Sequence, residues 1–115
     1  MIEYTVPFPP SCNGLFAGKA RRYVSKPYAR WKKLAGWEMR RQGVRPATGR
    51  VVIDIALTAP DRRHRDSSNY IKAIEDLAVS MGVLAGDSHE HVKGVTAHWA
   101  TEPGEPGARV RIMPA

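Results

Sequence analysis

Residues 60–87 read P-D-R-R-H-R-D-S-S-N-Y-I-K-A-I-E-D-L-A-V-S-M-G-V-L-A-G-D. A basic run at residues 62–65 stands directly before the carboxylate of Asp66, and a second isolated acid, Asp87, closes the stretch. Cationic side chains can hold a polyanion, whereas carboxylates can hold a hard divalent cation such as Mg²⁺, which takes oxygen ligands and keeps several waters. The stretch therefore suits phosphate chemistry.

The middle of this stretch predicts a helix. Asp66, Ser67 and Ser68 are all suitable N-caps, and Gly82 is a natural stop. Apolar residues between them recur at spacings of three and four and form one face: Tyr70, Ile71, Ile74, Leu77, Ala78 and Met81. The N-terminus of such a helix adds backbone N–H groups and a partial positive charge, both of which favour a bound anion.

Polar residues lie beside that apolar face. Asn69, Lys72 and Asp76 are three and four residues apart and share one stripe of the helix. We therefore expect Asn69 and Lys72 to lie within reach of whatever Asp66 binds. A solvated amphipathic helix preceded by a basic loop would show the same pattern, so the spacing alone does not establish a site.

The same residues resemble a known family. The run R-R-H-R-D-S-S-N-Y-I-K-A-I-E-D-L, followed by G-V-L-A-G-D, is similar to the core motif of the RusA-type Holliday junction resolvases, small Mg²⁺-dependent endodeoxyribonucleases often encoded by phages and prophages. The family pattern is R-x-D-x-D-N, a Lys three residues after the Asn, and a later Asp in a short G-x-x-x-D-D-like segment. V-P-F-P-P-S-C-N, at residues 6–13, resembles the opening strand and P-P-S-x-N turn of the family, and Arg22 to Trp31 resembles the approach to its first helix, so the resemblance covers nearly the whole chain.

The resemblance implies roles for individual residues. Asp66 and Asp87 would bind Mg²⁺, with Mn²⁺ as a substitute, and would form the catalytic set together with Lys72. Lys72 would stabilise the charge that develops on the phosphate or on the leaving oxygen. The residues implied to hold the DNA are Arg62, Arg63, Arg65, Asn69 and Lys72.

One position departs from the family pattern. Where the family has its second carboxylate, this chain has Ser68, whose neutral hydroxyl is a weaker ligand for a hard dication. Ser68 could coordinate directly or through a water, and Glu90 is the acid nearest to Asp87 in the sequence after it. Two outcomes stay open. Either the site is active with only two carboxylate ligands, or the protein binds junctions but cleaves them poorly.

The resemblance also implies a function and an assembly. RusA-type enzymes act as homodimers that resolve four-way (Holliday) junctions by paired symmetrical nicks, in DNA recombination and repair or in phage DNA processing. We expect apolar residues of the second half, Val83 and Leu84 among them, to contribute to a two-fold interface. Two rival classes are a catalytically weakened junction-binding protein, which would bind without metal and without nicking, and a basic RNA-binding domain, which would prefer RNA to branched DNA.

The composition agrees with a nucleic-acid partner. The 115 residues include 18 Lys and Arg against 11 Asp and Glu, a formal net charge of +7, which favours a polyanionic partner. This length predicts a single domain, residues 1–115. The single cysteine, Cys12, forms no internal disulfide, and no apolar run is long enough to span a membrane. We therefore expect a cytoplasmic protein, bacterial or in the host cytoplasm if phage-encoded.

The remaining segments predict an α+β fold. We expect strands at residues 2–6, 50–59, 92–100 and 108–113, the last two paired as an antiparallel hairpin. In the second of these strands alternation predicts one apolar face, formed by Val51, Ile53, Ile55 and Leu57. A further helix should run from Lys26 to about Gln42 with Ser25 as N-cap. Its expected apolar face is Tyr28, Trp31, Leu34, Ala35 and Met39. The order of elements predicts one domain with a mixed sheet and both helices on one face, RusA-like.

Three side chains keep more than one interpretation. Trp37 fits the core, a dimer contact or a base-stacking surface, and the basic side of its helix could face DNA or solvent. Asp54 could be an ion-pair partner or an extra metal ligand. Asn13, in the loop expected at residues 11–18, could be a turn residue only or a secondary contact of the site.

Three histidines follow Asp87. His89, His91 and His98 lack a nearby cysteine and any recognised catalytic spacing, so the pattern does not favour a zinc site. We interpret residues 89–91 as a polar turn next to the acidic site.

Overall fold

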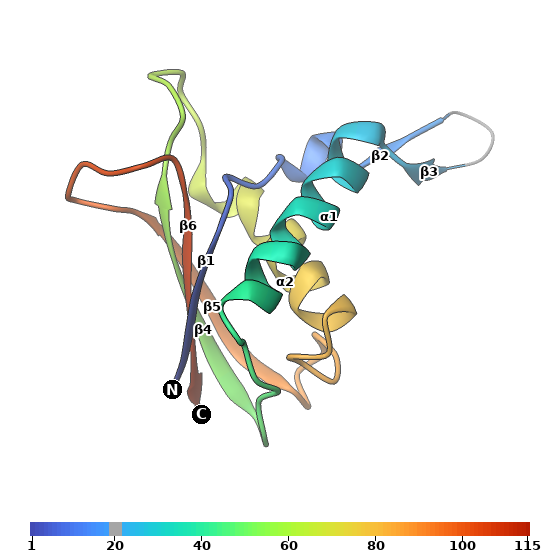
Figure 1. Ribbon diagram of the computed structural model, residues 1–115, viewed down its shortest axis with the longest axis vertical. Coiled ribbons are helices and arrows are strands. Elements are labelled where there is room, and N and C mark those ends of the chain that lie inside the picture. The colour runs from blue at the N-terminus through green and yellow to red at the C-terminus, as the bar shows by residue number, and fades with distance from the viewer. Residues whose placement is uncertain (19–21) are drawn as a thin grey trace.

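A four-stranded mixed sheet carries two helices on one of its faces (Figure 1). The computed structural model describes residues 1–18 and 22–115. The strands of the sheet are β1 (Ile2–Val6), β4 (Val51–Thr58), β5 (Val92–Trp99) and β6 (Gly107–Pro114), and the helices are α1 (Lys26–Arg41) and α2 (Ile71–Ser80). These elements confirm the predicted α+β class, the mixed sheet and the placement of both helices on one face.

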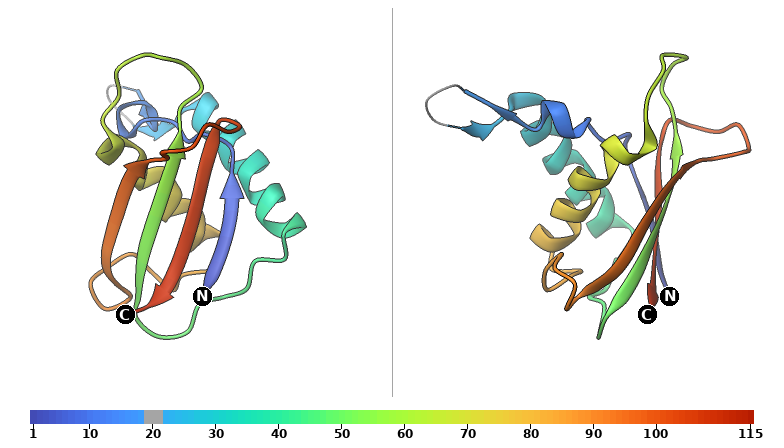
Figure 2. Two further views of the ribbon diagram at one scale, coloured as in Figure 1. Left: turned by 90° about the vertical axis from the view of Figure 1, so that its left-hand side faces the viewer. Right: turned by 180° about the vertical axis from the view of Figure 1, so that it is seen from behind.

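The last two strands do not form the hairpin that we expected. The strand order is β1-β6-β4-β5: β6 pairs antiparallel with both β1 and β4, whereas β5 pairs parallel with β4 at the edge (Figure 2). Ala108, Val110 and Ile112 of β6 are at most 2% exposed. A central position buries this strand's apolar side between two neighbours and under the helices, which removes more apolar surface from water than an edge position would.

Side chains of the sheet alternate between a covered face and an open face. In β4 the inward residues are Val51, Ile53, Ile55 and Leu57, all buried as the alternation predicted. The open face, which is turned to the viewer at the left of Figure 2, carries polar pairs: Arg111 Nε lies 2.8 Å from Glu3 Oε2, and His98 Nε2 lies 3.2 Å from Asp54 Oδ1. The structure thus pairs Asp54 with a side chain of the neighbouring strand, which supports a structural role over that of a metal ligand.

Helix α1 begins as predicted, but its buried face is rotated around the helix relative to the predicted one, with Gly36 buried in place of Leu34. The side chain of Ser25 accepts a hydrogen bond from the backbone N–H of Tyr28, and Pro27 occupies the first turn. The buried residues of the helix are Tyr28, Trp31, Ala35, Gly36 and Met39. The prediction for Leu34 was wrong: it is 54% exposed, since it lies about 140° around the helix from the buried Met39. Trp37 is 58% exposed, which excludes its core interpretation.

Helix α2 is entered through a 3-10 helix, Ser67–Tyr70. Asp66 is the flanking residue, but it caps through its backbone carbonyl, which accepts from the Asn69 N–H at 3.0 Å, and not through its side chain. The buried residues of this segment are Tyr70, Ala73, Ile74, Leu77 and Ala78. Gly82 ends the helix with a φ of +77°, a conformation that glycine adopts without strain.

Val83 and Leu84 follow directly and are 3% and 5% exposed. They belong to the hydrophobic core of the chain itself. A buried side chain offers no surface to a second subunit, so the expectation that these two residues contribute to a two-fold interface was wrong.

Short elements fill the segment that we expected to be a loop. Cys12–Gly14 forms a 3-10 helix, and β2 (Phe16–Ala17) pairs antiparallel with β3 (Tyr23–Val24). This small hairpin projects away from the sheet beside the start of α1 (Figure 1). In the described ranges, 1–18 and 22–115, the structure has no helix with the length and apolarity needed to cross a membrane.

Candidate functional site

Lys72 lies between two carboxylates at the start of α2. Its Nζ is 3.1 Å from Asp76 Oδ1, one turn along the helix, and 3.4 Å from Asp87 Oδ2, fifteen residues later in the chain. The hydrogen bond to Asp76 is the main cause that raises the pKa of Lys72, and Asp87 adds to it. The ammonium therefore stays charged, and the structure joins two of the predicted catalytic residues, Lys72 and Asp87.

Asp76 also accepts a hydrogen bond from a side chain of the core. The hydroxyl of Tyr28, a residue only 1% exposed, donates a hydrogen bond to Asp76 Oδ2 at 3.2 Å. Burial and the neighbouring Asp76 raise the pKa of Tyr28, so its hydroxyl remains a donor. The spacing in sequence predicted that Lys72 and Asp76 share a stripe, but the contact between α1 and α2 spans 48 residues and has no local signal.

A third acid stands close to the same cluster. Glu75 is half-buried, and its pKa is raised mainly by desolvation and further by the negative charge of Asp87. Sequence reasoning gave this residue no role. The arrangement concentrates negative charge around one cation, a setting in which an added divalent cation would relieve repulsion.

The other predicted residues lie at the start of the helix. Asp66 and Ser68 are exposed, and Asn69 is half-buried with its side-chain oxygen 3.7 Å from the thiol of Cys12. This contact brings the P-P-S-C-N turn against the beginning of the helix, as the resemblance implied. Asn13 lies in that turn and is exposed, and its role as a secondary contact stays a prediction.

The basic loop is organised around Asp61. Its carboxylate accepts from Arg65 Nη1 at 2.7 Å and from Arg65 Nη2 at 3.0 Å, and Arg63 Nε lies 3.3 Å away. These donors hold the pKa of Asp61 well below its usual range, with Arg65 as the largest cause. The Arg65 guanidinium also lies 5.5 Å from the centre of the Phe8 ring. Arg65 thus anchors the loop from a largely buried position, Arg63 contacts the same carboxylate while 79% exposed, and Arg62 is exposed; the DNA contacts of all three stay predictions.

The loop that carries Asp87 is packed against a histidine. A Cβ atom on Gly86 would lie 2.9 Å from Cδ2 of His91, so a larger residue here would require the ring or the loop to shift. The backbone carbonyl of His89 accepts a hydrogen bond from Arg50 Nε at 2.8 Å. These contacts support the loop beside the acidic cluster, while His98 lies on the open face of the sheet with Asp54.

The donor atoms at the site suit a hard cation. Asp66 and Asp87 offer carboxylates, and Ser68 and Asn69 offer a hydroxyl and an amide oxygen. Among the residues that the structure describes, no three His, Cys, Asp or Glu side chains form a cage for a metal. Mg²⁺ does not need such a cage, because one or two carboxylates suffice when waters and substrate phosphates complete the shell. The chemistry of these oxygen donors therefore fits a hydrated divalent cation whose shell is completed by waters and substrate.

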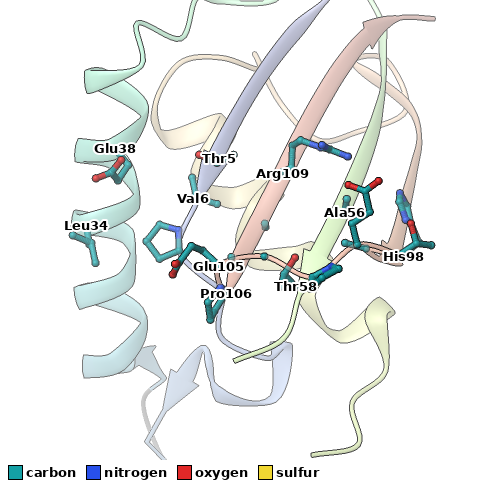
Figure 3. Close-up of a pocket in the computed structure, with 18 residues that line it drawn as sticks. Thr5, Val6, Leu34, Glu38, Ala56, Thr58, His98, Glu105, Pro106 and Arg109 are labelled. Carbon is teal, nitrogen blue, oxygen red and sulfur yellow. The ribbon is translucent and has the colours of Figure 1, made fainter. Parts of the chain in front are cut away.

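A cavity of about 840 Å³ lies elsewhere, along the open face of the sheet and the β5–β6 connection (Figure 3). Thr58, His98 and Arg109 line it, and none of the predicted site residues does. Glu38, Glu102 and Glu105 are also among its lining residues. Their negative charges disfavour a polyanion, so this cavity is not the site of the phosphate chemistry.

Comparison with known proteins agrees with this geometry. The model of the family Endodeoxyribonuclease RusA matches residues 7–113 of the chain. This chain belongs to the RusA family. A curated relative, crossover junction endodeoxyribonuclease RusA of Aquifex aeolicus (strain VF5), is 32% identical over 85 residues. The match covers 73% of this RusA-family chain and 66% of the relative, slightly less than two thirds of its length.

Proposed function

We propose that this RusA-family protein is a Mg²⁺-dependent endodeoxyribonuclease that resolves four-way DNA junctions. The observation that carries the proposal is the contact of Lys72 Nζ with Asp87 at 3.4 Å. It joins two residues that the motif gives as the catalytic lysine and a metal-binding acid, although they are far apart in the sequence. The family match over residues 7–113 supports the same reaction class.

The proposed chemistry divides between the acids and the lysine. Asp66 and Asp87 would hold Mg²⁺ with the Ser68 hydroxyl as a weaker oxygen donor, and Mg²⁺ when bound supplies Lewis-acid charge to the scissile phosphate and lowers the pKa of a nearby water. Lys72 places a permanent positive charge beside Asp87. A charge that is fixed before the reaction stabilises negative charge on the phosphate or the leaving oxygen without reorganisation. Mn²⁺ would serve as a substitute with the same oxygen donors.

DNA would be held through its backbone. Arg62 and Arg63 extend from the loop just before Asp66, and the helix start behind them offers backbone N–H groups. Phosphate contacts position a duplex but carry no sequence information, so recognition would depend first on the shape of the junction. If about six phosphates are neutralised, affinity should fall roughly a thousandfold between low and near-physiological salt.

We further propose that the protein acts as a homodimer, because two sites related by a two-fold axis can nick two strands of a junction symmetrically. A single site would need two separate encounters. The molar mass in solution by light scattering, at the concentrations used for cleavage, tests the assembly. A monomeric mass under conditions of full activity would contradict it.

Ser68 supports one alternative. With a hydroxyl where the family has a carboxylate, the protein could bind four-way junctions and cleave them poorly. The two functions predict opposite responses to Ser68→Asp: the variant gains cleavage from almost nothing if the site is disabled, and it changes only the Mg²⁺ requirement if the site is active.

The decisive experiment compares cleavage of a synthetic four-way junction with that of a linear duplex of the same sequence, in Mg²⁺ and in Mn²⁺. The proposal predicts symmetrical nicks in opposite strands of the junction, little cutting of the duplex, and loss of nicking in Asp66→Asn. Binding of the junction without nicks by the unaltered protein would leave the junction-binding alternative. A preference for RNA would contradict both.

A further inference from the structure

We propose that Asp76 is a positioning residue, which together with Tyr28 holds the Lys72 ammonium at the reaction centre. The inference deepens the proposed function and rests on it, because it takes Lys72 as the side chain that stabilises developing charge. Both residues lie in segments that the resemblance covers, but it gave neither Asp76 nor Tyr28 a role.

The two oxygens of Asp76 accept from two different donors. Oδ1 faces Lys72 Nζ at 3.1 Å, and Oδ2 accepts from the Tyr28 hydroxyl at 3.2 Å. The carboxylate is one quarter exposed, whereas Lys72 is half exposed. A flexible lysine near solvent is thus tied to a carboxylate whose own orientation is fixed from behind.

Tyr28 is a rigid anchor for that carboxylate. It is 1% exposed, and its ring stacks on Trp31 with centroids 6.2 Å apart and meets the edge of Phe16 at 6.4 Å. Its hydroxyl therefore has little freedom to move away from Asp76. The resulting chain of contacts runs from the core of α1 through Asp76 to Lys72 and ends at Asp87.

Asp87, the second acid beside Lys72, cannot hold the lysine in position once the site is loaded. Asp87 is 3.4 Å from Lys72 Nζ, but the proposed function commits its oxygens to the divalent cation. A lysine held by Asp87 alone would then lose its partner when the site is loaded. Asp76 lies on the same helix as Lys72, one turn away, so it keeps its contact whatever Asp87 binds.

A purely structural pair predicts something different. If the contact between Lys72 and Asp76 only stabilises α2, its loss lowers the melting temperature and leaves the cleavage rate of the folded protein unchanged. If Asp76 positions Lys72, the cleavage rate falls while junction binding does not. Binding should even tighten slightly, because Asp76→Asn removes a negative charge near the DNA.

The experiment measures the single-turnover rate of junction nicking at saturating protein, junction affinity in EDTA, and the melting temperature. The variants are Asp76→Asn, Tyr28→Phe and Lys72→Ala, and the first two are also made in the Lys72→Ala background. Glu38→Gln is the matched control, because it removes the ion pair of Glu38 with Arg41 at 2.7 Å on α1, outside the proposed site. We expect Asp76→Asn to slow nicking by about 10- to 100-fold and Tyr28→Phe by several-fold, with affinity unchanged or tighter.

Non-additivity supplies the sharpest criterion. If Asp76 and Tyr28 act through Lys72, neither substitution slows nicking further once Lys72 is alanine. Equal losses in both backgrounds, or full activity of a folded Asp76→Asn, would overturn the positioning role. Tyr28→Phe, which removes a single oxygen, applies the same criterion if Asp76→Asn does not fold. Wild-type cleavage by Lys72→Ala would instead overturn the proposed function of Lys72, and the inference with it.

Discussion

The basic loop, residues 61–65, and the start of α2 have opposite arrangements of charge. In the loop one acid, Asp61, lies between two arginines, whereas on the helix one lysine, Lys72, lies between two acids. The side chain of Arg65 is 10% exposed and packs near Phe8, but that of Lys72 is 51% exposed. The comparison teaches that the number of cations in a motif overstates the charge offered to DNA, because one cation of the loop is used to build the loop.

The largest expected effect comes from the helix side. Asp87→Asn removes a proposed metal ligand and one partner of Lys72, so we expect nicking of the junction to fall by about a thousandfold. Junction affinity in EDTA should stay the same or improve, because a negative charge is lost. Glu102→Gln, an exposed acid in the β5–β6 connection, is the control. If Asp87→Asn kept more than a tenth of the nicking activity, Asp87 would not be a metal ligand of the proposed site.

The loop that carries Asp87 offers the next effect. In Gly86→Ala the new methyl group would meet the His91 ring at 2.9 Å, so the ring or the loop must shift, and we predict that the loop moves and carries Asp87 away from Lys72. We expect a loss of activity of about tenfold to a hundredfold. Adding His91→Ala should restore part of the rate by making room. Failure of the second change to help would mean that the packing of Gly86 does not set the position of Asp87.

Arginine substitutions test the other side of the comparison. Arg65→Ala should lower the melting temperature and loosen the loop, measured as faster proteolysis, because it removes both hydrogen bonds to Asp61. Arg62→Ala should change the unfolding free energy by no more than about 0.5 kcal/mol, as is usual for an exposed side chain. Equal effects on stability would erase the distinction between an arginine that builds the loop and one that faces solvent.

Salt dependence gives the smallest and most specific effect. Removal of one phosphate contact should weaken binding about equally for all sequences and reduce the slope of log affinity against log salt by about one. We expect this change for Arg62→Ala and for Arg63→Ala, in titrations of the junction by fluorescence anisotropy. Lys33→Ala, on the exposed side of α1, shows whether that helix also faces the DNA. If the slope of log affinity against log salt were unchanged for both loop variants, neither arginine would contact a phosphate, and the DNA would bind another surface of the protein.

Much of this architecture follows from local patterns. Alternation predicted the buried side of β4, the spacing of apolar residues predicted α2, and Ser25 and Pro27 marked the start of α1. The motif assigned Lys72 and Asp87 to one site, and the structure places their side chains 3.4 Å apart, while their catalytic roles stay predictions. These successes share a cause, since each signal depends on residues that are neighbours in sequence or on a pattern kept by the family.

The predictions that were wrong or missing concern contacts between residues that are far apart in the sequence. The pairing of β6 with β1 and β4 is a competition among strands for the central positions, which no single segment reveals. Val83 and Leu84 looked available for a partner because sequence does not show what covers a residue. The bond between Tyr28 and Asp76 joins two helices, so sequence placed both residues on the right elements without showing that they meet.

The central claim of the proposed function is that Asp66 and Asp87 hold a divalent cation which makes cleavage of a junction possible. Its most direct test is the single-turnover nicking rate of a four-way junction, titrated with Mg²⁺ for the unaltered protein, Ser68→Asp and Asp66→Asn. We predict that the unaltered protein nicks and saturates, that Ser68→Asp reaches its half-maximal rate at about tenfold lower Mg²⁺, and that Asp66→Asn stays inactive. Nicking independent of Mg²⁺, or equal in the unaltered protein and Asp66→Asn, would contradict the account.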